Sequence, residues 1–237
     1  MYESEITVPF SSCGKDGKMK LGNAVALMVD CCQFQEYQEL AFRNYLTANQ
    51  IAVLLSSLQI DIIQMPSFRE KIYTTVKIYG CQAFYGLRRI TMHNEYGNLC
   101  LIANAAGAFF NLKTMRAVKI DPDACGIKFD TAEDMECLPR KITIPTVSGT
   151  PLPALTVKRS GVDSNGHLTS SAYFSIAEDA LPEEFTYNRI RLEYKQQAKL
   201  KSLILPVIYS DMSANTIVVD MKSGNGTSYG VAEFSSI

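Results

Sequence analysis

The sequence predicts an α+β protein in which one helix followed by a run of antiparallel strands occurs twice. The first supporting observation is that both halves of the chain show the same order of a turn, a helical stretch and several strand-like runs. The second is that the turns between these runs have the residues that connect neighbouring antiparallel strands. The pattern indicates a helix packed on a curved sheet, duplicated within one chain.

The first half begins with an alternating stretch at residues 3–10. A glycine-rich turn at 13–17 leads into a helical stretch around residues 23–33. Strand-like runs follow at residues 51–65, 71–79, 84–93 and 99–112. The turn signals at 65–67 and 94–97 suit antiparallel connections.

The second half repeats this order, with a short strand at 155–159 and a turn at 161–167. Thr169 or Ser170 is the expected N-cap of the helix that follows, and Pro182 is expected to end it. Apolar residues recur on one face of this helix at Tyr173, Ile176, Ala177, Ala180 and Leu181. Residues 190–194 alternate at period two, and runs at 202–211, 215–222 and 228–235 complete a second sheet.

Residues 121–153 lie between the halves and are rich in Asp, Pro, Thr and Gly, with little periodicity. They predict a linker that crosses the surface, with one helical turn at 132–137. The expected organisation is an N-terminal domain at 1–128, a linker at 129–152 and a C-terminal domain at 153–237.

Bulk composition narrows the class of protein. Of the 237 residues 47% are apolar, which is enough for one large domain or two domains of about 110 residues each. The balance of 23 basic and 24 acidic residues argues against a broad nucleic-acid footprint. No apolar run is long enough to span a membrane, and the seven scattered cysteines lack metal-ligand spacing. We therefore expect a cytoplasmic protein with reduced thiols and no metal.

Several segments together resemble one family. The run Asp163-Ser164-Asn165-Gly166-His167, followed by a helix that carries Tyr173, is similar to the motif of the second hot-dog domain in plant and bacterial acyl-acyl carrier protein thioesterases. Residues 192–194, and residues 62–66, 70–72 and 84–89 in the first half, also resemble family segments. The resemblance extends from about residue 4 to residue 235.

The resemblance implies two tandem hot-dog domains and hydrolysis of fatty acyl groups from acyl carrier protein (ACP), a lipid-biosynthetic reaction that ends chain elongation without a cofactor. By position it assigns catalysis to Asp163, Asn165 and His167. The family usually has Glu and then Cys where this chain has Gln197 and Ala198, so an expected carboxylate is missing. Strict alternation places Gln197 on a solvated face with Arg191, Glu193, Lys195 and Lys199.

Thioester hydrolysis requires an activated water and a polarised carbonyl. His167 is the preferred base or water-orienting group, Asp163 is a base or electrostatic partner, and Asn165 positions water or thioester. The resemblance also implies that the backbone N–H groups of His167 and Leu168 face the carbonyl and stabilise its oxyanion. If Gln197 reaches the site, it can hold a water but cannot take its proton.

Each of these residues also has a structural explanation. Asp163 can simply cap the turn through its side chain, Asn165 can occupy a left-handed turn position, and His167 can be an exposed turn residue. Aligned on Gly17 and Gly166, the first half has other residues at the three catalytic positions, namely Gly14, Asp16 and Lys18. We therefore expect one active site per chain, with the first half shaping the acyl pocket.

Candidate pocket-lining residues lie on the first helix, although a buried core face explains them equally well: Leu27, Met28, Cys31 and Phe34. Three basic pairs are candidate contacts for an acidic carrier protein, or ordinary solvated surface: Arg88-Arg89, Arg140-Lys141 and Lys158-Arg159.

Two other functions remain open, an acyl-coenzyme A thioesterase of the hot-dog type and a non-catalytic double hot-dog protein that binds acyl groups or carrier protein. The absence of Gly-x-Ser-x-Gly and phosphate-binding glycine motifs disfavours serine hydrolase and nucleotide chemistry. The sequence is compatible with a monomer or a homodimer.

Overall fold

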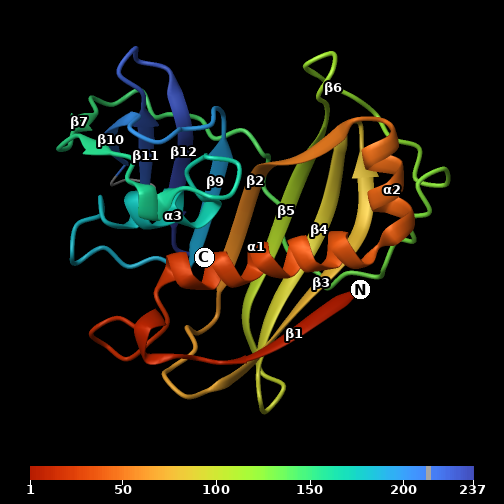
Figure 1. Cartoon of the computed structure of the whole chain (residues 1–237). Coiled ribbons are helices and arrows are strands. Elements are labelled where there is room, and N and C mark those ends of the chain that lie inside the picture. The colour runs from red at the N-terminus through yellow and green to blue at the C-terminus, as the bar shows by residue number, and fades with distance from the viewer. Residues whose placement is uncertain (212–214) are drawn as a thin grey trace. The chain divides into compact units, whose positions relative to one another are not determined.

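The computed structural model describes residues 1–211 and 215–237 (Figure 1). The chain forms two compact units. The first comprises Met1–Lys20, Leu27–Leu58 and Ile62–Cys137, and the second comprises Leu21–Ala26, Gln59–Asp61 and Leu138–Ile237. The passage from the first unit to the second after Cys137 falls within the predicted linker at 129–152.

The first unit contains a sheet of hydrogen-bonded strands, four of which are long. In spatial order they are β1 (Tyr2–Thr7), β3 (Lys71–Gln82), β4 (Tyr85–Asn94), β5 (Leu99–Asn111) and most of β2 (Ile51–Ile62), with β6 (Arg116–Ala117) paired to β5. The pairs β1–β3, β3–β4 and β4–β5 are antiparallel. The β4–β5 turn is closed by the Asn94 side chain, which accepts the N–H groups of Tyr96 and Asn98, and by Gly97 at φ +78°. The four predicted long strands are therefore confirmed.

Helix α1 (Leu21–Gln38) confirms the predicted helix and extends it at both ends. In the part that belongs to the first unit, Met28 and Cys31 are fully buried, and the Cys31 thiol donates to the Thr74 carbonyl on β3 at 3.3 Å. A break at Glu39, with φ −78° and ψ 74°, ends the helix.

Helix α2 (Leu40–Ala48) was not predicted. It buries Phe42 and Leu46, one turn apart, in a cluster with Phe109 and Cys125. Most of its other side chains are partly or fully exposed, so only a two-residue apolar signal marks it in the sequence.

The second unit contains the second sheet. Its spatial order is β9 (Arg189–Tyr194), β12 (Ser228–Ser235), β11 (Thr216–Lys222), β10 (Leu203–Asp211) and β7 (Thr150–Pro151), with β8 (Leu155–Thr156) also paired to β10. Helix α3 (Ser170–Glu178) begins after Thr169, as predicted, and ends before Ala180 and Leu181. It buries Tyr173, Phe174 and Ala177. Of the predicted apolar face, Tyr173 and Ala177 are therefore confirmed, whereas Ile176 is half-buried and Ala180 and Leu181 lie beyond the helix.

The prediction of a helical turn at residues 132–137 was wrong, because this segment has no helical structure. Side chains of the first sheet hold it instead. Lys77 forms an ion pair with Glu133 at 2.6 Å, and Arg89 donates to the sulfur atoms of Met135 and Cys137. Further along, Ile142 is buried in the second unit against Val218 and Val231.

No helix within residues 1–211 and 215–237 is long and apolar enough to cross a membrane. The same residues contain no group of three or more His, Cys, Asp or Glu side chains placed to hold a metal ion.

Candidate active site

The turn before α3 carries the three predicted catalytic side chains. It follows the short helix η2 (Arg159–Gly161) and is closed by a bridge between Val162 and Leu168. The Asp163 N–H donates to the His167 carbonyl at 2.8 Å, and Gly166, at φ +77°, donates to the Asp163 carbonyl at 3.0 Å. Glycine is favoured there because other residues avoid a left-handed backbone.

Asp163 stabilises the turn with its side chain. One carboxylate oxygen, Oδ1, accepts the N–H groups of Asn165 at 2.9 Å and His167 at 3.0 Å. The structural role considered for Asp163 is therefore present, and Oδ2 lies outside these two hydrogen bonds. The Asp163 side chain is therefore held against the backbone of the turn.

The side chains of Asn165 and His167 are not used to hold the turn together. Asn165 is exposed and His167 is half-buried. Within the part of the chain that the structure describes, neither side chain has a hydrogen-bond partner. Both are therefore available to a water molecule or a substrate.

The segment that carries Gln197 lies beside this turn. The Leu168 N–H donates to the Ala198 carbonyl at 2.8 Å, and His167 bridges to Lys199. The Tyr173 hydroxyl on α3 accepts the Ala198 N–H at 3.0 Å and donates to the Gln196 carbonyl at 3.2 Å. Burial raises the pKa of Tyr173, so its hydroxyl stays protonated. The backbone on both sides of Gln197 is therefore fixed next to His167.

Gln197 itself has an exposed side chain, but alternation along the strand is not the reason. β9 ends at Tyr194, so the period-two pattern does not reach Gln197. The expected solvated face is also wrong for Glu193, which is 7% exposed and accepts from Arg140 and from the Ile142 N–H.

The predicted oxyanion donors are already engaged. The His167 N–H donates to Asp163 and the Leu168 N–H donates to Ala198, so neither is free to bind a substrate oxygen in this arrangement. The first turn of α3 offers others, because the first N–H groups of a helix have no acceptor within it. Thr169 makes no capping hydrogen bond with its side chain, which leaves the N–H groups of Ser170 and Ser171 as the nearest candidates.

The first unit contains the same turn without the same side chains. After η1 (Phe10–Ser12), Gly14 donates to the Lys18 carbonyl at 2.8 Å, and Gly17 has φ +75°. The N–H of Met19 donates to the Pro66 carbonyl as that of Leu168 does to Ala198, which places Met65 at the position of Gln197.

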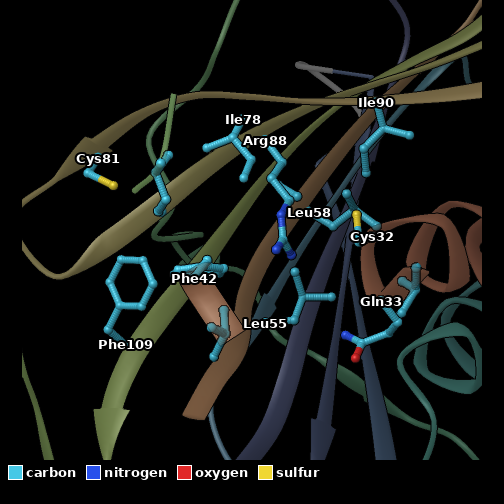
Figure 2. Close-up of a pocket in the computed structure, with 16 residues that line it drawn as sticks. Cys32, Gln33, Phe42, Leu55, Leu58, Ile78, Cys81, Arg88, Ile90 and Phe109 are labelled. Carbon is cyan, nitrogen blue, oxygen red and sulfur yellow. The ribbon is translucent and has the colours of Figure 1, made fainter. Parts of the chain in front are cut away.

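An apolar pocket lies within the first unit, between its helices and its sheet (Figure 2). The empty space between its walls is about 680 Å³ with the mouth included, and about 60 Å³ is wide enough for the centre of a water molecule. It is therefore a narrow slot. A Cβ atom at Gly86 would lie 2.9 Å from the Phe109 ring, and one at Gly107 would lie 2.7 Å from Val53. The two glycines give these apolar side chains their room.

The residues of α1 that line this slot are not the predicted ones. Val29, Cys32 and Gln33 line it. Of the predicted residues, Met28 and Cys31 are buried, with Cys31 bonded to Thr74, Leu27 is half-buried, and Phe34 is 54% exposed beside Tyr2; none of them lines the slot. Their contact with an acyl chain stays a prediction. Both Met28 and Cys32 are buried, so α1 buries more than one face, and the sequence does not show which of them meets a cavity.

The basic pairs also differ from expectation. Arg88 lines the pocket and Arg89 is 4% exposed, so this pair is not a docking surface. Arg140 is bonded to Glu193, whereas Lys158 and Arg159 are exposed just before the turn.

Residues 1–127 match the family model described as the N-terminal domain of acyl-ACP thioesterases. Among solved structures, an acyl-ACP thioesterase from Bacteroides thetaiotaomicron is similar with a TM-score of 0.85 at 18% identity, covering 98% of this chain and 96% of that one. A 12:0-ACP thioesterase from Umbellularia californica is similar with a TM-score of 0.81 at 12% identity, covering 99% and 96%. No curated protein matches the sequence. The predicted fold class, two tandem hot-dog domains, is confirmed.

Proposed function

The chain belongs to the acyl-ACP thioesterase family, and we propose that it hydrolyses the thioester of fatty acyl-ACP to a free fatty acid and the carrier thiol. This reaction ends elongation of the fatty acyl chain. The observation that carries the proposal is the turn at residues 163–167, which presents a half-buried histidine with an uncommitted side chain beside a fixed carboxylate.

The proposed chemistry begins with water. His167 takes a proton from a water molecule as its oxygen attacks the thioester carbonyl, and Asn165 orients that water or the thioester. The negative charge of Asp163 favours the imidazolium that forms. When the tetrahedral intermediate collapses, the carbon–sulfur bond breaks and the thiolate takes the proton from His167.

The oxyanion of that intermediate needs N–H donors. Ser170 and Ser171, at the positive end of α3, supply them in this proposal. Gln197 holds water beside His167 without accepting a proton, so the base is a residue of the turn.

Two further observations support the substrate. The slot in the first unit has mostly apolar walls and is narrow, and both properties suit an alkyl chain. Exposed cations flank the turn in the second unit, which suits an acidic carrier protein: Lys158, Arg159, Lys199 and Lys201.

The test is release of free fatty acid by the purified protein from acyl-ACP and from the matching acyl-coenzyme A esters. We expect release with preference for the carrier-protein substrate, and loss of that preference at high salt because surface charges are screened. Preference for coenzyme A esters at every salt concentration would replace the proposed substrate. Binding of either substrate without release would support a non-catalytic binding protein.

A further inference from the structure

One charged side chain stands in the otherwise apolar slot of the first unit. Arg88 is the single charged residue among the described residues that line it, and Gln33 is the single amide. Figure 2 shows the Arg88 side chain extending from β4 into the middle of the lining residues, among Leu58, Phe42 and Cys32. An alkyl chain that fills this slot must pass a guanidinium group.

The guanidinium is only partly paired. Its Nη2 atom lies 3.3 Å from Oε2 of Glu36, and both side chains are mostly buried, at 14% and 22% exposed. Burial raises the pKa of the neighbouring Cys32 thiol, which therefore stays neutral and adds no second negative charge. A guanidinium has five N–H donors, so its contact with Glu36 and its hydrogen bond with the Cys32 side chain do not use all of them.

These spare donors decide between ligands. A saturated chain in the slot would strip water from them and return no hydrogen bond, which is unfavourable. A chain with an oxygen substituent would accept from them. A site built to hydrogen-bond a substrate oxygen discriminates strongly against the analogue that lacks it.

The sign of the charges selects the kind of oxygen. Arg88 and Glu36 together are neutral, so a carboxylate in the slot would leave a net negative charge in apolar surroundings. A neutral hydroxyl or keto oxygen leaves the pair balanced.

We propose that the slot binds acyl chains that carry a neutral oxygen, a hydroxyl or a keto group, held by Arg88. The proposal rests on the proposed function for its thioester, but the binding of the chain is a separate property. Arg88 can also join α1 to the sheet through Glu36, and that structural role would affect stability without affecting the choice of chain.

The experiment compares kcat/KM for saturated, hydroxy and keto acyl thioesters of equal length, with the oxygen moved along the chain. We expect the wild type to favour an oxygenated chain by about tenfold to a hundredfold. Arg88→Met should abolish that ratio. Arg43→Met, the same change at an arginine that stacks on Tyr37 outside the slot, should keep it.

Glu36→Gln provides a second variant that keeps the shape of the side chain. It leaves Arg88 without its counter-charge, so the preference should move toward chains that end in a carboxylate. Equal rates for all wild-type substrates, or a ratio that survives in Arg88→Met, would overturn the proposal.

Displacement of a fluorescent fatty acid by free saturated, hydroxy and keto fatty acids separates this inference from the proposed function. Selective displacement without thioester hydrolysis would refute the hydrolase and retain the oxygen site. Hydrolysis without any selectivity in rate or in displacement would support the hydrolase and refute the oxygen site.

Discussion

The turns at residues 13–18 and 162–168 have the same backbone and different side chains. Gly14 and Asp163 both donate to a carbonyl four residues later at 2.8 Å, and Gly17 and Gly166 have φ +75° and +77°. The N–H of Lys18 is accepted by Asp16, whereas that of His167 is accepted by Asp163. The chain therefore makes this turn with a carboxylate at either of two positions, so folding alone does not require Asp163, Asn165 and His167 together.

A second difference lies in the segment next to each turn. Ala198 offers its carbonyl to Leu168 and its N–H to Tyr173. In the first half, Pro66 offers the equivalent carbonyl but has no N–H, and the helix position of Tyr173 holds Ala24. We call the hydrogen bond between the Tyr173 hydroxyl and the Ala198 N–H the tyrosine tether. The tyrosine is thus present in the half whose neighbouring segment has an N–H to donate.

The largest expected effect is the loss of His167. His167→Ala should lower kcat by at least about 10²-fold with an unchanged circular dichroism spectrum, because a base or water-holder is gone. Lys18→Ala, the matched change in the first turn, should leave kcat as it is. Near-wild-type turnover in His167→Ala would remove the chemical distinction between the two turns.

Asp163→Asn tests whether the carboxylate does more than hold the turn. Asparagine keeps an oxygen that accepts from Asn165 and His167 but carries no charge. We expect about tenfold lower kcat, equivalent to roughly 1.4 kcal/mol, at an unchanged Tm. Asp163→Ala should also lower the Tm, because both hydrogen bonds are lost. Full activity in the asparagine variant would assign Asp163 to the turn alone.

The tether is tested by a double-mutant cycle. Tyr173→Phe leaves the buried Ala198 N–H without an acceptor, and we expect the free energy of unfolding to fall by about 1–3 kcal/mol in chemical denaturation. Adding Ala198→Pro, as in the first half, removes that N–H and should recover about 1 kcal/mol relative to additivity.

Tyr194→Phe is the control for the tether, because its hydroxyl donates to the Ser170 carbonyl and accepts from no described backbone N–H. Additive costs within about 0.5 kcal/mol in the Tyr173–Ala198 cycle would show that the two positions are not coupled.

The last prediction is that placing the catalytic side chains in the first turn has no effect on activity. Lys18→His with Asp16→Asn, built on a His167→Ala background, should give no activity, because Met65 stands where Gln197 does and the surroundings have diverged. Recovered release of fatty acid from this protein would contradict one site per chain.

Much of the fold could be predicted because its signals are local. Alternation and turn residues mark the strands, and the apolar face around Tyr173 marks α3. Helix α2 escaped because only Phe42 and Leu46 are buried on it. The false helical turn at 132–137 had the opposite cause, since that segment has no helical structure and Lys77 and Arg89 bind it through contacts distant in sequence.

The sequence predicted which residues form the candidate site better than it predicted which groups those residues contact. The position of the turn follows from Gly166 and its neighbours, and the acceptor of the His167 N–H, Asp163, belongs to the turn itself. The acceptor of the Leu168 N–H, Ala198, is distant in the sequence. Burial of both Met28 and Cys32 on α1 similarly hides which face meets the slot. Tertiary packing, not local propensity, decides both.

The glycines at Gly86 and Gly107 have a consequence for how such a protein changes over generations. A single methyl group at either position presses on Phe109 or Val53 and narrows the slot, yet both lie in the first unit, whereas the turn that carries His167 belongs to the second. Under the proposed function, a one-residue substitution there resets which chains are accepted while the hydrolytic residues stay the same. Related proteins can then come to accept different acyl chains through substitutions in the slot, while the residues that hydrolyse the thioester stay unchanged.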